Sequence, residues 1–195
     1  MRINRQNYEM YFLDYLEGSL GPSDVAEVLL FMEQHPDHLN RVTFLQIAPL
    51  SRADLRAYGE IRGLLERAAG RINGRFAETD WTPIRYLNRN FSHEVLMGFL
   101  RNARAGVVTP MRDGMNLVAK EFVAVRDDGG GALILSRFAG ASRELRDALI
   151  VNPYDVEQLA EAIRAGLEMS PSEVSARMER MRDVVKEHNI YRWAG

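Results

Sequence analysis

The feature that most restricts the fold of this chain is an alternation of short apolar runs with helical patterns from about residue 41 onward. The run at 42–48 is nearly continuously apolar and ends at Pro49, which predicts a strand buried on both faces. Repeated strand–helix units of this kind predict an α/β fold with a parallel, doubly wound sheet, whose ligands bind at the carboxyl ends of the strands. Strands are expected at 42–48, 84–88, 106–109, 132–136 and 149–151. Helices are expected at about 51–72, 94–102, 155–169 and 172–186, together with one that the 111–121 segment opens and that runs to about 125.

The first 40 residues have a different character. Aromatic side chains recur at helical spacing between Tyr8 and Tyr15, and Pro22 and Ser23 are suited to open a second helix that ends at the 35–38 turn. We therefore expect a short helical hairpin over residues 1–40, before a domain over 41–195. The aromatic stripe is expected to pack on the rest of the chain or to form a homo-oligomer contact.

The segment 111–121 carries the strongest chemical signal. It follows an apolar run, passes through a glycine turn and opens a helix, a layout that presents free backbone N–H groups to an anion. Carboxylates stand at both ends, Asp113 and Glu121. Amides for a diphosphate together with acceptor carboxylates for hydroxyl groups are what a sugar-nucleotide site needs.

Composition excludes several classes of function. A net charge of -2, from 25 basic and 27 acidic residues, argues against a nucleic-acid or anionic-membrane partner. The absence of cysteine excludes thiol catalysis and cysteine-ligated metal, and it favours a reducing, cytoplasmic location. The four histidines are scattered in the sequence, so neither a metal site nor another cofactor is expected.

From about residue 44 to 193 the chain resembles the C-terminal half of trehalose-6-phosphate synthases. The strings that carry the resemblance are FLQIAP at 44–49, AGRING at 69–74, WTP at 81–83, YLN at 86–88, RDGMNLVAKE at 112–121, FAGA at 138–141 and ALIVNPYD at 148–155. The resemblance implies a GT-B glycosyltransferase with Rossmann-like domains. It also implies transfer of glucose from UDP-glucose to glucose-6-phosphate, with retention of configuration and without a metal ion.

The resemblance also implies roles for particular residues. Asp113, the catalytic candidate, matches the aspartate that binds the donor glucose, and Glu121 matches the glutamate that binds the uridine ribose. Phe91 matches a position beside the uracil, and Arg62 matches the arginine that contacts the acceptor phosphate. Backbone amides are implied to contact the donor's glucose at Gly114, Met115 and Asn116, and its diphosphate at Leu117, Val118, Ala119 and Lys120.

The chain also departs from the family pattern. The N-terminal Rossmann domain and the first strand-turn of the C-terminal domain, with its arginine and lysine, do not precede the matched region. Residues 1–40 instead resemble the N-terminal segments of anti-sigma-factor-like proteins, which suggests a fusion. We therefore expect the chain alone to transfer no glucose. The alternative is a non-catalytic fusion, scaffold or interaction protein built on this domain.

Overall fold

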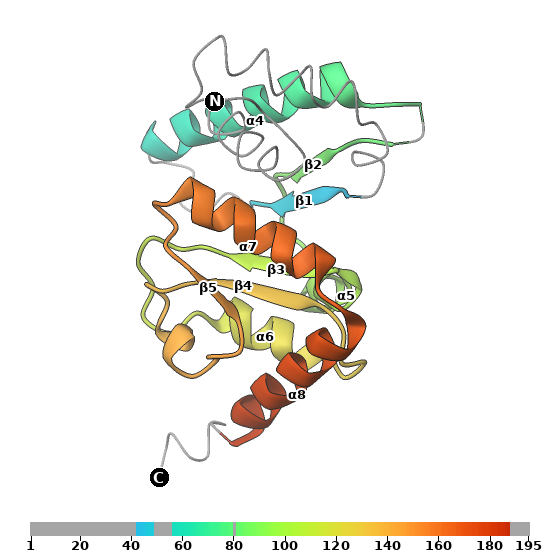
Figure 1. Ribbon diagram of the computed structural model, residues 1–195. Helices are drawn as coiled ribbons and strands as arrows, with labels where there is room; N and C mark the ends of the chain where they lie inside the picture. Colours follow the sequence, from blue (N-terminus) through green and yellow to red (C-terminus); the bar gives the residue numbers. More distant parts are fainter. Residues whose placement is uncertain (1–41, 49–55, 80, 188–195) are drawn as a thin grey trace. The chain divides into compact units, whose positions relative to one another are not determined.

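The computed structural model describes residues 42–48, 56–79 and 81–187, and the hairpin expected over 1–40 lies outside them. The chain divides into two compact units between Phe91 and Ser92, and each unit is described by itself (Figure 1). The expected parallel α/β architecture is confirmed. Among the described residues the five strands pair as one two-stranded and one three-stranded parallel sheet, rather than as a single continuous sheet.

The first unit contains a β-α-β motif made of β1 (Phe44–Ile47), α4 (Arg56–Phe76) and β2 (Ile84–Leu87). The two strands are parallel, with Phe44 opposite Ile84. The Asn73 side chain joins α4 to β2, because its amide nitrogen donates to the Ile84 carbonyl at 2.8 Å and its oxygen accepts from the Ile84 amide at 3.1 Å. One asparagine thereby satisfies both backbone polar groups at the start of β2.

The expectation that the first strand is buried on both faces is wrong, because Phe44 is 37% exposed and the rest of β1 is half-buried. The first half of α4 is also open, with Ile61 and Leu64 55% and 60% exposed. Strands of four residues span about 13 Å, whereas the 21-residue helix spans about 31 Å. The helix therefore extends past the sheet, and its buried apolar residues lie in its second half, at Ala68, Ile72 and Phe76.

The second unit contains the three-stranded sheet, in the order β3-β4-β5 with both pairings parallel. Its strands are β3 (Ala105–Val108), β4 (Ala132–Ser136) and β5 (Leu149–Val151). Its helices are α5 (His93–Asn102), α6 (Leu117–Val125), the 3-10 turn η1 (Gly140–Arg143), α7 (Val156–Glu168) and α8 (Pro171–Glu187).

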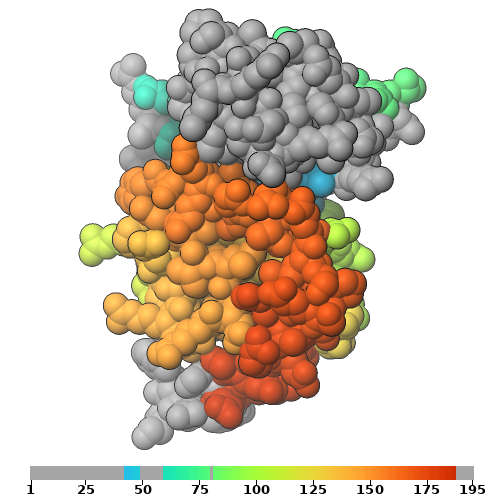
Figure 2. All heavy atoms as spheres, viewed as in Figure 1, coloured from blue at the N-terminus to red at the C-terminus, as the bar shows by residue number. Residues whose placement is uncertain are grey.

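Helices cover both faces of this sheet, as the sequence predicts. All five residues of β4 are buried, and successive side chains point to opposite faces. On one face, Leu133 and Leu135 join a core with α6 and α8. On the other face, Gly166 of α7 lies against Ala132 and Ile134. Figure 2 shows α7 and α8, in orange and red, forming much of the visible surface of this unit.

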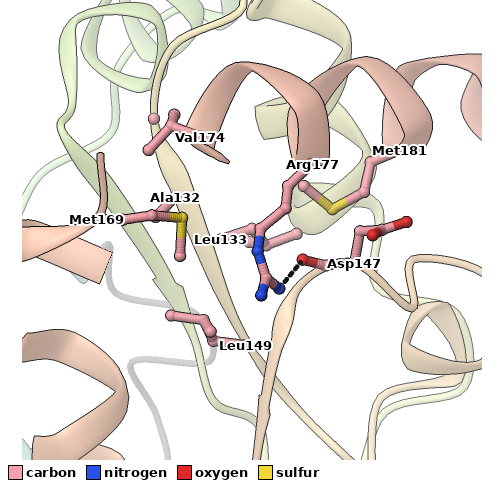
Figure 3. Close-up of a pocket in the computed structure, with 9 residues that line it drawn as sticks. Ala132, Leu133, Asp147, Leu149, Met169, Val174, Arg177 and Met181 are labelled. Atoms are coloured by element: carbon pink, nitrogen blue, oxygen red, sulfur yellow. Dashed lines mark hydrogen bonds between the residues drawn. The ribbon is translucent and has the colours of Figure 1, made fainter. Parts of the chain in front are cut away.

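The helix α8 docks on the sheet through its methionines. Met178 and Met181 are 0% and 2% exposed and belong to the core that includes Leu133 and Leu135. Met181 also lines a cavity of about 10 Å³ at the amino end of β4, between β5 and α8 (Figure 3). That volume is close to the lower limit for a single water molecule, so this cavity is a packing defect and not a site for a substrate.

Candidate functional site

The 111–121 segment lies at the carboxyl end of the three-stranded sheet, where it connects β3 to α6. Its first half is docked on the loop that follows β4. Asp113 forms a parallel β-bridge with Ala139. The Asp113 amide donates to the Phe138 carbonyl at 3.2 Å, and the amides of Gly140 and Ala141 donate to the carbonyls of Asp113 and Met115 at 3.2 and 2.9 Å. The position of the acidic loop is therefore set by backbone contacts.

Gly140 makes this docking sterically feasible. A Cβ atom built on Gly140 would lie 1.9 Å from the backbone oxygen of Gly114, far inside van der Waals contact. A side chain at this position would therefore force the two loops apart. Sequence reasoning treated Gly140 only as part of a matching string, because nothing local in the sequence shows a contact between loops about 25 residues apart.

The Asp113 carboxylate organises the turn that leads into α6. Its Oδ1 accepts a hydrogen bond from the Met115 amide at 3.3 Å, and its Oδ2 accepts one from Asn116 Nδ2 at 3.0 Å. Asn116 has a left-handed backbone conformation (φ 67°, ψ 89°), which asparagine tolerates better than most residues. Its side-chain oxygen accepts from the Ala119 amide at 2.9 Å and so caps the helix.

The helix that the 111–121 segment opens begins at Leu117, and its first turn is open to solvent. The side chains of Leu117 and Val118 are 61% and 48% exposed. Amides in the first turn of a helix have no intrahelical acceptor. Ala119 receives the Asn116 cap, whereas within the described residues the amides of Leu117 and Val118 have no protein acceptor. Two N–H groups and the positive end of the helix dipole are thus available to an anion.

One turn further along, two charged side chains of α6 are held by neighbouring elements. Lys120 Nζ lies 2.9 and 3.1 Å from the carboxylate oxygens of Glu144, which follows η1. Glu121 Oε1 lies 3.5 Å from Nε2 of His93, the first residue of α5. Sequence reasoning identified Lys120 and Glu121 but neither of these partners, because both lie far away along the chain.

The remaining predicted site residues, Arg62 and Phe91, belong to the first unit. The hydrogen bond from Arg62 Nε to Glu66 Oε1, at 2.6 Å, raises the pKa of the Arg62 guanidinium, which stays charged. With its amide turned to match its partners, Asn88 accepts from Arg62 Nε at 2.7 Å and donates to the Ala48 carbonyl at 3.0 Å. Arg62 therefore lies near the carboxyl ends of β1 and β2.

Phe91 is half-buried, and the Arg89 guanidinium carbon lies 4.6 Å from its ring centroid. A ring that is partly open to solvent can serve as a binding surface or as packing, so the role of Phe91 stays a prediction. Within the described parts of the chain, no group of three or more acidic or histidine side chains is placed to hold a metal ion. The helices described there are also too short or too polar to cross a membrane.

Comparison with known proteins gives consistent matches over the length of the chain. Residues 23–195 match the model of glycosyltransferase family 20. A trehalose-6-phosphate synthase of Klebsiella pneumoniae is 48% identical over 182 residues, and one of Escherichia coli O9:H4 is 47% identical over 192 residues. These alignments cover 93% and 97% of this chain but 38% and 40% of the relatives. The chain therefore spans about two fifths of their length.

Solved structures agree with this assignment. An E. coli structure bound with UDP-2-fluoro glucose superimposes with a TM-score of 0.79 and 43% identity, covering 99% of this chain and 40% of that one. A synthase from Burkholderia xenovorans in complex with glucose-6-phosphate gives a TM-score of 0.79 and 45% identity, covering 98% and 40%.

The family match begins at residue 23 and the E. coli alignment leaves only a few residues uncovered, so both enter the segment expected to have another origin. A separate anti-sigma-factor-like piece is not shown. The family strings and the parallel α/β fold agree with the matches. The chain belongs to glycosyltransferase family 20.

Proposed function

We propose that this chain is the nucleotide-sugar-binding part of a trehalose-6-phosphate synthase and that it binds UDP-glucose. The observation that carries the proposal is the open first turn of α6, with Asp113 before it and Glu121 one turn along it. Support comes from the family membership and from the relatives whose structures contain UDP-2-fluoro glucose or glucose-6-phosphate.

The polar groups suit the parts of a sugar nucleotide. The amides of Leu117 and Val118 would donate to the diphosphate, where the helix dipole adds to their effect. An ionised carboxylate offers about four lone-pair sites, and the structure shows two used at Asp113. Asp113 can therefore hold its own loop and still accept hydrogen bonds from glucose hydroxyls. Glu121 would accept hydrogen bonds from the ribose hydroxyls.

The chemistry supported by this arrangement is charge stabilisation and positioning. When the bond from the anomeric carbon to the diphosphate oxygen breaks, negative charge builds on UDP, and N–H donors already in place stabilise it without reorganising. The new bond forms from the acceptor hydroxyl on the same face of the sugar, and the hydroxyl proton passes to the departing phosphate. No side chain acts as a nucleophile in this scheme.

Two further roles belong to the first unit. Arg62 would contact the phosphate of glucose-6-phosphate, since a guanidinium binds phosphate through paired N–H groups. Its Nε bonds Glu66, so the phosphate would meet its Nη atoms. Phe91 would lie beside the uracil ring.

The domain division also stays a proposal. We retain the helical hairpin over 1–40 as a prediction, with self-association through it as one alternative and packing within the chain as the other. Size-exclusion chromatography with light scattering separates these alternatives, because a dimer supports the first and a monomer the second. The lack of cysteine remains the argument for a cytoplasmic setting.

Calorimetric titration tests the binding proposal. We expect the chain to bind both UDP and UDP-glucose. Glu121→Ala should weaken the binding of both ligands about tenfold or more, because a hydrogen bond to a charged group contributes roughly 1.5–3 kcal/mol. Glu179→Ala, which removes the same charge from an exposed site on α8, should leave both affinities unchanged.

A second variant separates the sugar from the nucleotide. Asp113→Asn keeps an oxygen for the Met115 amide but removes the charge. We expect it to weaken UDP-glucose binding and to spare UDP binding. Absence of heat at millimolar UDP, or equal binding by the Glu121→Ala variant and the unmodified chain, would remove the proposal and leave the scaffold alternative.

A further inference from the structure

His93 is placed to act on Glu121 from a neighbouring helix. It is the first residue of α5, where the Ser92 hydroxyl caps the helix by accepting from the Val95 amide at 3.4 Å. Helices α5 and α6 pack side by side in the second unit (Figure 1). That packing brings His93 Nε2 to 3.5 Å from Glu121 Oε1.

The position of Glu121 explains why an orienting partner is useful. In a helix, residues four apart lie on the same face, and side chains lean toward the N-terminus. Glu121 therefore shares a face of α6 with Leu117, whose amide is one of the two open ones. The Glu121 carboxylate can contact a nucleotide bound at the start of α6, but only when the long side chain points toward that nucleotide.

The two acids of the site differ in how they are held. The Asp113 carboxylate is fixed within its own loop by the Met115 amide and the Asn116 side chain. Glu121 is longer and its side chain is 36% exposed, and its ion-pair contact within the described residues is to His93. Fixing the rotamers of a glutamate when a ligand binds costs conformational entropy. A partner that already holds the side chain in the unliganded protein reduces the entropy lost on binding.

We propose that His93 is a positioning residue that orients the Glu121 carboxylate toward the ribose hydroxyls of the nucleotide. The inference rests on the proposed function, because it takes a nucleoside diphosphate as the ligand. His93 itself touches Glu121 and not the nucleotide. Its side chain is 72% exposed, so its effect on affinity is that of an exposed pair.

The test compares two ligands, UDP and a UDP whose ribose lacks both the 2′- and 3′-hydroxyls. In His93→Ala we expect the affinity for UDP to fall about two- to fivefold, the range of an exposed ion pair. The affinity for the dideoxy ligand should not change, because that ligand has no hydroxyl for Glu121 to accept from. His93→Gln, which keeps an N–H donor, should restore part of the lost UDP affinity.

Two controls separate this role from a structural one. Glu94→Ala alters the first turn of the same helix at an exposed position and should leave both affinities unchanged. In a Glu121→Ala background, adding His93→Ala should have no further effect on UDP binding. Circular dichroism of each variant confirms that the fold is retained.

The outcomes distinguish the inference from the function beneath it. If the unmodified chain binds UDP no better than the dideoxy ligand, the ribose contact fails and the inference fails with it. If the unmodified chain prefers UDP but His93→Ala leaves UDP binding intact, or weakens both ligands equally, the inference alone is overturned.

Discussion

The polar groups at the two ends of α6 have opposite environments, open to solvent at the N-terminal end and buried at the C-terminal end. At the N-terminal end, the side chains of Leu117 and Val118 are exposed and their amides are open. At the C-terminal end, Arg126 is 6% exposed and also pairs with Asp128 at 3.1 Å. Its guanidinium donates to four backbone carbonyls of the surrounding segments, those of Leu100, Arg101, Ala103 and Gly130.

The difference shows how one short helix can anchor a fold at one end and present open N–H groups at the other. Buried polar groups need partners, and Arg126 supplies them at one end. At the other end, the uncapped N–H groups carry no burial cost because water reaches them. We therefore expect substitutions at the C-terminal end to change stability, and substitutions at the N-terminal end to change binding.

The largest effect on stability is expected at the closed end of α6, the C-terminal end where Arg126 is buried. Arg126→Met keeps much of the apolar stem against Phe122 but leaves buried carbonyls without a donor. We expect the free energy of unfolding to fall by roughly 3 kcal/mol, as for other broken buried polar contacts. Urea denaturation followed by circular dichroism measures this loss. A loss below about 1 kcal/mol, or altered UDP affinity in the folded variant, would contradict the division of α6 into a stabilising end and a binding end.

A smaller effect is expected at the open, N-terminal end of α6. There a matched pair of substitutions separates the contribution of the helix cap to stability from that of the backbone conformation. Asn116→Ala loses the cap on Ala119 and also puts alanine, which tolerates the left-handed region less well than asparagine, at φ 67°. Together these changes should cost about 2 kcal/mol of stability. Asn116→Gly should cost only a few tenths of a kcal/mol of stability, because glycine accepts the positive φ. Thermal unfolding of both variants checks this order, and equal losses would contradict it.

The smallest effect concerns Asp127, just beyond the closed end. The hydrogen bond from Arg101 lowers the pKa of this exposed carboxyl below its ordinary 3.8. The folded state therefore holds the proton less tightly than the unfolded state, and the stabilisation is present above the ordinary pKa. It is lost as the pH falls below 3.8 through the lowered value.

For the same reason, Asp127→Asn should be slightly less stable than the unmodified chain at pH 7. The two proteins should converge under strongly acidic conditions, where both side chains are uncharged. Urea midpoints measured across that pH range test the sign. A gap that widens on acidification would show that the contact acts differently.

Sequence patterns located the strands well where burial is complete. The runs at 132–136 and 149–151 match β4 and β5, because apolar runs bounded by glycine and polar residues leave little choice. The same reasoning overestimated the burial of β1, since a sequence does not show how far a long helix extends past a short strand.

The candidate site was predictable as a list of residues but not as a set of contacts. Asp113 and Glu121 stand out in the sequence, whereas His93 and Gly140 matter only through partners brought close by folding. Arg126 was missed for a similar reason. An arginine at a helix end usually lies at the surface, and only the tertiary structure shows the carbonyls around it.

The close approach of Gly140 to the Gly114 backbone restricts which residue homologous proteins can have at this position. Because no side chain fits there while the two loops stay joined, a homologous protein with any other residue at this position must hold its acidic loop in a different way. Such natural exceptions can be found by sequence alone, and they would mark the lineages in which the proposed sugar contact has been rebuilt or lost.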